Sequence, residues 1–174
     1  MDLSAAFDTI EHFVFLNRLQ KNFGITGLAL AWFQSYLSYR CQFLRIGDSK
    51  SPETPCCTSV QYGYVLGPMR FSSYTSPIVQ IVSSFGLLHQ QYADDTQLHV
   101  EISKDNHSLA LDQLKHCQVV LHTWFCHNSL ALNHDKSDEI TFGAAHRTRS
   151  LPNISTVNIA GVIVPISDHI KLLG

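Results

Sequence analysis

Residues 91–100, QYADDTQLHV, place two adjacent aspartates inside a segment with the pattern of a β-hairpin. After the pair, apolar or β-branched residues alternate with polar ones: Thr96, Leu98, Val100 and Ile102 with Gln97, His99 and Glu101. This two-residue period is typical of a half-buried strand, and it predicts that Asp94 and Asp95 lie at the turn. Because neighbouring acids repel each other and disfavour strand structure, the pair needs a physical explanation.

Two interpretations of the aspartate pair are open from these residues alone. Aspartate is common in surface turns, where its side chain hydrogen-bonds the nearby backbone. Alternatively, two carboxylates at a tight turn and a third acid from elsewhere can hold magnesium ions. Two such ions, about 3.5–4 Å apart, would stabilise the attacking and leaving oxygens of a phosphoryl transfer. The segment MDLSAAFDT offers Asp2 and Asp8 as the third acid.

Composition restricts the class of protein. The 174 residues, 45% hydrophobic and 15% charged, suit a folded globular chain that forms one domain or part of one. A formal net charge of −2, from 12 Lys and Arg against 14 Asp and Glu, gives little support to nucleic-acid binding. No apolar run is long enough to span a membrane and no signal peptide opens the chain, so we expect no membrane partner.

The cysteines give a second restriction. Their odd number, five, and the lack of metal-ligand pairing indicate reduced thiols in an intracellular protein, with nucleus or cytoplasm left open. An alternative treats Cys117, His122, Cys126 and His127 as zinc ligands, although their spacing matches no familiar zinc finger.

Hydrophobic periodicity predicts helices mixed with hairpin strands. Helices are expected at 9–22, from the Thr26 cap through Leu37, at 68–83 and at 106–128. Strands are expected at 41–47, 139–142, 156–161 and 169–174, with a loop at 49–55. The long helix should bury Ala110, Leu114, Cys117, Leu121 and Trp124. These elements predict an α+β fold with an antiparallel sheet covered by helices on one face.

Five ordered segments resemble the reverse transcriptases of non-LTR (LINE-type) retrotransposons. They are DLSAAFDTIEH, GLALAWFQSYLSYRCQFLRIGDSKS, VLGP, YADD and LNHDKSDEITFG, and the final HIKLLG is similar to the start of the next strand motif. The resemblance covers nearly the whole chain and implies one partial domain over 1–174, a polymerase palm that lacks most of the fingers and thumb. It also implies two Mg²⁺ ions, deoxynucleotides, an RNA template and a DNA primer as cofactors and partners, with the oligomeric state left open.

The resemblance assigns roles to individual residues. Asp2 matches the metal-binding acid of the first palm motif, and Asp94 and Asp95 match the paired acids of the catalytic hairpin. Lys136 matches the lysine that protonates the leaving pyrophosphate, although a lysine in a polar loop is usually only solvated. Phe7 matches the aromatic residue that excludes a ribose 2′-hydroxyl. The alternative is that Phe7 is an ordinary phenylalanine of the core. Asp8 is not assigned as a ligand.

The chain also departs from the family pattern. Where the family has GVPQGSVLGP, residues 59–68 are SVQYGYVLGP, which leaves Tyr62 and Gly63 as the candidate substrate-binding residues of this loop. Two tyrosines add bulk where close approach is needed, and the lost glycine restricts the backbone. Arg70 stands where the family has an apolar residue, in a helix expected to be buried.

These departures, and the missing fingers and thumb, predict a degenerate copy without polymerase activity. Two other functions are retained as alternatives. One is a domesticated, non-catalytic nucleic-acid-binding or scaffold module with a palm fold. The other is a different two-metal phosphoryl transferase, such as a nuclease.

Overall fold

The computed structural model describes residues 1–4, 6–58, 66–103, 105–143, 156–159 and 162–167. The chain divides into two compact units, one made of Met1–Ser4 with Ser76–Gly174 and the other of Ala5–Thr75. Each unit is described by itself. The single partial domain expected over 1–174 stays a prediction.

The hairpin predicted from the aspartate pair is present in the first unit. Strand β6, Leu88–Tyr92, pairs antiparallel with β7, Asp95–His99. Thr96 is buried on β7 and His99 is exposed, as the alternating pattern requires of a strand with one covered face.

Two further strands complete this part of the first unit. Strand β1, Asp2–Ser4, pairs antiparallel with β8, Ala131–Asn133, and Asp2 lies opposite Asn133. Met1 and Thr96 exchange both backbone hydrogen bonds, each with a donor–acceptor distance of 2.9 Å. Because a reciprocal bond pair is the narrow pair of an antiparallel ladder, β1 continues the β6–β7 hairpin at this point. The β1–β8 and β6–β7 pairs are two separate two-stranded sheets, and the Met1–Thr96 bonds connect one to the other.

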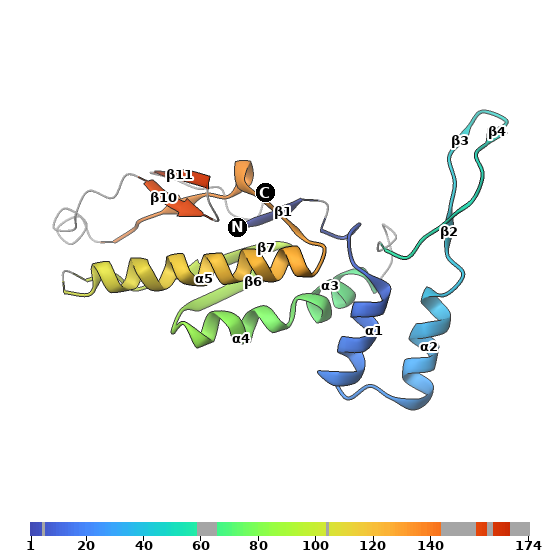
Figure 1. Cartoon of the computed structure of the whole chain (residues 1–174), viewed down its shortest axis with the longest axis horizontal. Helices are drawn as coiled ribbons and strands as arrows, with labels where there is room; N and C mark the ends of the chain where they lie inside the picture. The colour runs from blue at the N-terminus through green and yellow to red at the C-terminus, as the bar shows by residue number, and fades with distance from the viewer. Residues whose placement is uncertain (5, 59–65, 104, 144–155, 160–161, 168–174) are drawn as a thin grey trace. The chain divides into compact units, whose positions relative to one another are not determined.

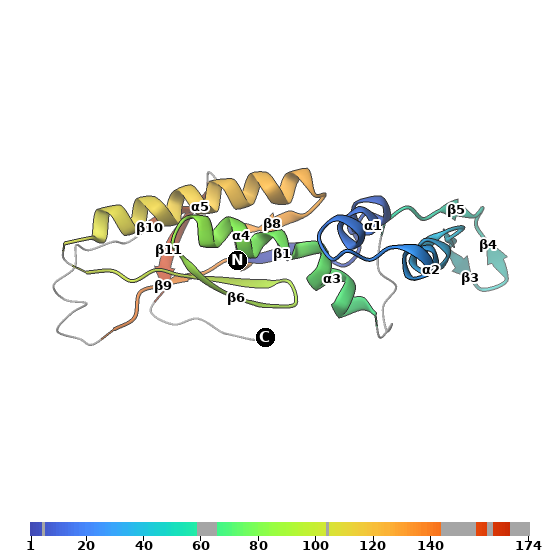
Figure 2. The ribbon, with the colours of Figure 1, turned by 90° about the horizontal axis from the view of Figure 1, so that it is seen from below.

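Two helices pack beside these strands. Helix α4, Pro77–Ser84, contacts both β6 and the long helix α5, His107–His127 (Figures 1 and 2). The apolar core of the unit is Leu3, Ile78, Val82, Leu87, Ala110, Leu114, Cys117, Leu121, Phe125, Leu130 and Val164.

The predicted inner face of α5 is correct for four of five residues and wrong for Trp124. Phe125 is fully buried, whereas Trp124 is only half-buried. Both residues fit helical spacing after Leu121, at three and four positions, so periodicity alone did not distinguish them.

The last described strands depart from a purely antiparallel arrangement. Strand β10, Thr156–Ile159, pairs antiparallel with β11, Val162–Ser167. Strand β11 also pairs with β9, Glu139–Ile140, and this pairing is parallel. The strand expected at 169–174 lies outside the described residues.

The second unit is a small helical cluster. Helix α1, His12–Lys21, packs against α2, Gly27–Leu37, and against α3, Gly67–Thr75. Its buried apolar residues are Ala6, Ile10, Phe15, Leu19, Leu37, Phe71 and Tyr74. On α2, Leu37 is buried, Phe33 and Tyr36 are half-buried, and Ala29 is exposed.

Residues 41–55 form short paired strands, not the single strand and loop expected. Strand β2, Cys41–Gln42, pairs with β5, Thr54–Pro55, and β3, Arg45–Ile46, pairs with β4, Ser49–Lys50. Gly47, between the two inner strands, has a φ of 58°, a conformation that costs glycine little. The expected strand therefore folds back on the expected loop.

The helix expected at 68–83 is divided into α3 and α4. Ser76 separates them and Pro77 is the first residue of α4. Proline has no backbone N–H to bond the preceding turn, so it starts a helix more readily than it continues one. The α+β class expected from the sequence is confirmed. No helix among the described residues has the length and hydropathy required to cross a membrane.

We predict that Leu121→Ala lowers the free energy of unfolding by about 2–5 kcal/mol, because Leu121 is 0% exposed in the core under α5. Val119→Ala, on the same helix at 48% exposure, is the matched control and should change stability much less. Urea unfolding of both variants measures the difference, and equal losses would contradict the assigned face.

Candidate functional site

The aspartate pair occupies the tight turn of the β6–β7 hairpin. Tyr92 and Asp95 are the last paired residues, so Ala93 and Asp94 form a two-residue loop. Ala93 has a φ of 53°, a left-handed conformation normally taken by glycine or asparagine in such loops. For alanine it costs roughly 1–2 kcal/mol. The turn is thus held in a specific shape against local preference.

Asp2 is brought to this turn by the pairing of Met1 with Thr96. The bonded pairing of these two strands is confined to Met1 and Thr96, the residues next to Asp2 and Asp95 in sequence. Strands β1 and β7 are also in contact, so Asp2 lies near the start of β7. The first-motif acid and the hairpin acids are therefore brought near each other by this pairing.

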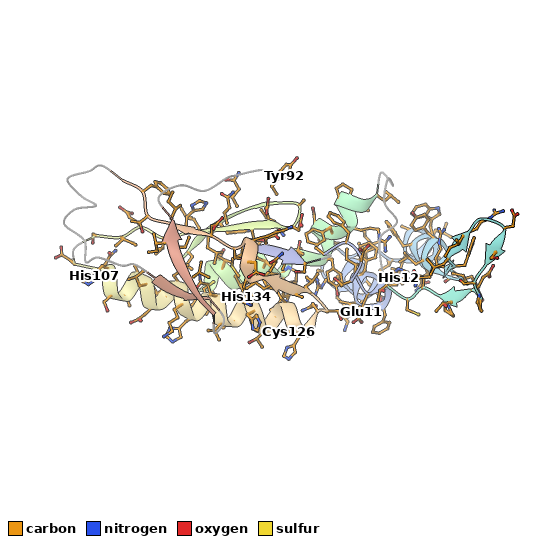
Figure 3. The ribbon with its side chains drawn as sticks, turned by 90° about the horizontal axis from the view of Figure 1, so that it is seen from above. Glu11, His12, Tyr92, His107, Cys126 and His134 are labelled. Atoms are coloured by element: carbon orange, nitrogen blue, oxygen red, sulfur yellow. The ribbon has the colours of Figure 1, made fainter. Side chains whose placement is uncertain are left out.

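Lys136 reaches the same region from the other side of β1. It ends the 3₁₀ turn η1, His134–Lys136, which follows directly on β8 (Figure 3 labels His134 in this turn). The neighbouring residue Ser137 is 3% exposed, and its Oγ accepts a hydrogen bond from the Asp2 N–H at 3.3 Å. The turn that carries Lys136 is thereby attached to the strand that carries Asp2.

The charges of these residues act on one another. Burial raises the pKa of Asp94 above its ordinary value, and the negative charges of Asp2 and Asp95 raise it further. A backbone hydrogen bond and the Lys136 ammonium oppose the rise. The effect of Asp2 on Asp94 exceeds that of Asp95, its neighbour in sequence. Asp2 and Asp94 are therefore strongly coupled across the strands.

A fourth half-buried acid, Glu139, lies near the same strands and was not predicted. Burial raises the pKa of Glu139, and the amino group of Met1 lowers it in part. Its Oε2 is buried and makes no hydrogen bond to the described residues. Burial lowers the pKa of the Met1 amino group itself, against the negative charges of Asp95, Asp2, Asp138 and Glu139. Acidic groups outnumber the two positive groups, Met1 and Lys136, in this region.

The donor chemistry suits a hard divalent cation, because carboxylate oxygens are the ligands that Mg²⁺ prefers. The side chains do not form a closed cage, however. In the part of the chain that the structure describes, no three His, Cys, Asp or Glu side chains are grouped closely enough to hold a metal ion. The backbone brings the three aspartates together, and their side chains would have to turn towards a bound ion.

Comparison with known protein families shows the family to which the chain belongs. The model of the family described as reverse transcriptase (RNA-dependent DNA polymerase) matches residues 1–174. The chain belongs to the reverse transcriptase family. A search of curated proteins found no match.

The remaining candidate residues of this reverse transcriptase chain lie in the second unit or outside the described residues. Phe7 belongs to the second unit, where its half-buried ring packs on Phe71 with centroids 4.9 Å apart. Asp8 is exposed in the same unit. Tyr62 and Gly63 lie outside the described residues.

Arg70 is buried, as expected, at 3% exposure. Its guanidinium carbon lies 5.3 Å from the centroid of the Phe15 ring, and burial lowers its pKa. An aromatic face attracts a cation, so the Phe15 ring gives this buried charge a partner. Arg18 makes the same kind of contact with Tyr74, at 4.5 Å.

The alternative zinc site has no support among the described residues. Burial raises the pKa of the Cys117 thiol to about 11, which disfavours the thiolate that zinc binds. His122 and Cys126 approach to 3.8 Å, but no third ligand joins them in the described ranges.

A cavity of about 660 Å³ in the second unit was also not predicted. It contains none of the candidate site residues. Its lining is Glu11, His12, Phe13, Leu37, Ser38, Tyr39, Arg40, Cys41, Pro55, Cys56, Cys57 and Thr58 (Figure 3 labels Glu11 and His12).

We predict that Asp94→Asn stabilises the metal-free reverse transcriptase chain at neutral pH. When the pKa of a carboxyl group is raised in the folded state, the protein loses stability as the pH rises through that pKa. A neutral amide at the same position avoids this loss. Below the ordinary aspartate pKa of about 3.9 the acid is neutral in both states, so the advantage should disappear.

Thermal unfolding at several pH values, with chelator present, measures this effect. Asp112→Asn, an exposed position on α5, is the matched control. A lower midpoint for Asp94→Asn at neutral pH would contradict the electrostatic description of the turn.

Proposed function

We propose that this reverse transcriptase chain is the palm of a non-LTR (LINE-type) retrotransposon polymerase. The order of the DLSAAFDTIEH, VLGP, YADD and LNHDKSDEITFG segments supports this type. The observation that carries the proposal is the Met1–Thr96 backbone pair, because it sets Asp2 beside the hairpin of Asp94 and Asp95. The reaction is the joining of a deoxynucleotide to a primer 3′-hydroxyl on an RNA template.

The proposed chemistry uses few protein groups. Asp2, Asp94 and Asp95 hold two divalent ions, which when bound supply positive charge at the reacting phosphates. Bound cations also favour the ionised form of Asp94, whose pKa is raised in the metal-free chain. The remaining task of the protein is to position substrate groups, which accounts for most of the acceleration in phosphoryl transfer.

Three other positions complete the proposed site. The Lys136 ammonium, on the turn attached to Asp2, donates a proton to the leaving pyrophosphate. Phe7 excludes the ribose 2′-hydroxyl, and its packing on Phe71 gives the ring one face to rest on. Tyr62 and Gly63, by their match to the family's substrate-binding segment, contact the nucleotide and template.

We further propose that this copy does not polymerise. The sequence SVQYGYVLGP carries two tyrosines and only two of the family's three glycines. Bulk in a loop that must approach a base pair displaces the substrate, and a misplacement of about 1 Å can cost a hundredfold in rate. The reacting groups of the palm are thus retained while the surface that positions the substrate is altered.

We predict no primer extension above background by the full chain. The assay uses an RNA template with a DNA primer, deoxynucleotides and Mg²⁺ or Mn²⁺. An active reverse transcriptase serves as positive control and Asp94→Asn as negative control. Incorporation by the wild-type chain that is lost in Asp94→Asn would refute the proposed inactivity and confirm the site.

Binding of the ion is tested separately from catalysis. We predict that Mg²⁺ titration shifts the NMR signals of the Asp94 and Asp95 side chains together and leaves those of Asp112 unchanged. Uniform weak shifts at all carboxylates would show that no metal site exists in this chain. In that case RNA affinity measured with chelator present would support the non-catalytic binding module.

A further inference from the structure

We infer that Ser137 is a positioning residue for the metal-binding acids, because its hydroxyl joins the strand of Asp2 to the turn of Lys136. The inference rests on the metal site proposed above and concerns how the protein holds that site. Neither the aspartate pair nor the family motifs assign a role to this serine.

The hydroxyl of Ser137 accepts one hydrogen bond and donates another. Its Oγ accepts from the Asp2 N–H at 3.3 Å and donates to the Asn133 carbonyl oxygen at 2.7 Å. Asp2 and Asn133 are also partners in the β1–β8 register. One buried oxygen therefore connects two residues that face each other across the strand pair.

The backbone of Ser137 fixes the turn as well. Its N–H donates to the His134 carbonyl oxygen at 3.2 Å, which closes η1 on the C-terminal side of Lys136. A serine at this position thus closes the lysine turn through its backbone and holds the aspartate strand through its side chain.

This link matters because Asp2 is at the first position of β1. On one side Met1 is bonded to Thr96 of the hairpin strand, and on the other side the Asp2 N–H is bonded to Ser137. Removal of the hydroxyl releases the bond on the Ser137 side and leaves the carbonyl of half-buried Asn133 without this donor, while the β1–β8 pairing remains. Outer residues that orient metal ligands typically change metal affinity 10–100-fold when mutated.

The experiment measures Mn²⁺ affinity of the full chain by isothermal titration calorimetry at neutral pH. The variants are Ser137→Ala, Ser137→Thr and Ser84→Ala. Ser84 is the matched control, because its hydroxyl donates to the Ile81 carbonyl at 2.6 Å on α4, outside the site. Urea unfolding of each variant reports stability independently.

We expect Ser137→Ala to weaken Mn²⁺ binding about tenfold, Ser137→Thr to restore it and Ser84→Ala to leave it unchanged. A loss of stability in Ser137→Ala with unchanged Mn²⁺ affinity would overturn the inference, since a purely structural serine behaves this way. If the wild-type chain does not bind Mn²⁺, or Asp94→Asn binds it equally well, the metal site itself is wrong. If Ser137→Ala does not fold, Ser137→Cys provides the same comparison with weaker hydrogen bonds.

Discussion

The reciprocal backbone pair between Met1 and Thr96 determines the geometry of the candidate site. Strand pairing has a period of two, so a shift of one residue would turn Asp2 to the opposite face of the sheet. With this pairing Asp2 lies near the hairpin, and the negative charges of Asp2 and Asp95 both raise the pKa of Asp94. Repulsion between carboxylates is therefore imposed by backbone hydrogen bonds that do not depend on the acids themselves.

Sequence patterns predicted the elements of this arrangement better than their partners. Alternation after Asp95 predicted the hairpin, and helical spacing predicted most of the buried face of α5, because both are periodic within one segment. The choice of Phe125 over Trp124 depends on the helix's neighbours, and spacing does not specify them. The same is true of β8 and β9, which are three and two residues long and have little pattern of their own, and of the parallel pairing of β9 with β11.

The candidate site also contains residues that the sequence predicted and residues that only the structure revealed. Asp2, Asp94, Asp95 and Lys136 were predicted from family motifs, and the structure places all four in one unit. Ser137 and Glu139 were missed because a single serine or glutamate has no distinctive spacing. Their burial, and the bond from Asp2 to Ser137, exist only after β1 has paired with β8. A polar residue beside a catalytic motif was the one available signal, and alone it does not distinguish a solvated loop from a buried link.

Backbone and side chains of the aspartates are organised to different degrees. Strand register and the strained Ala93 turn fix the backbone at Asp94 and Asp95, whereas no described group of three acids is closed around a point. This difference follows from electrostatics, because like charges in a partly buried region move apart when side-chain rotation allows it. A cation reverses the preference by attracting each carboxylate. In the proposed metal site, the strands and the Ser137 link would position the backbone, and a bound ion would draw the carboxylates together.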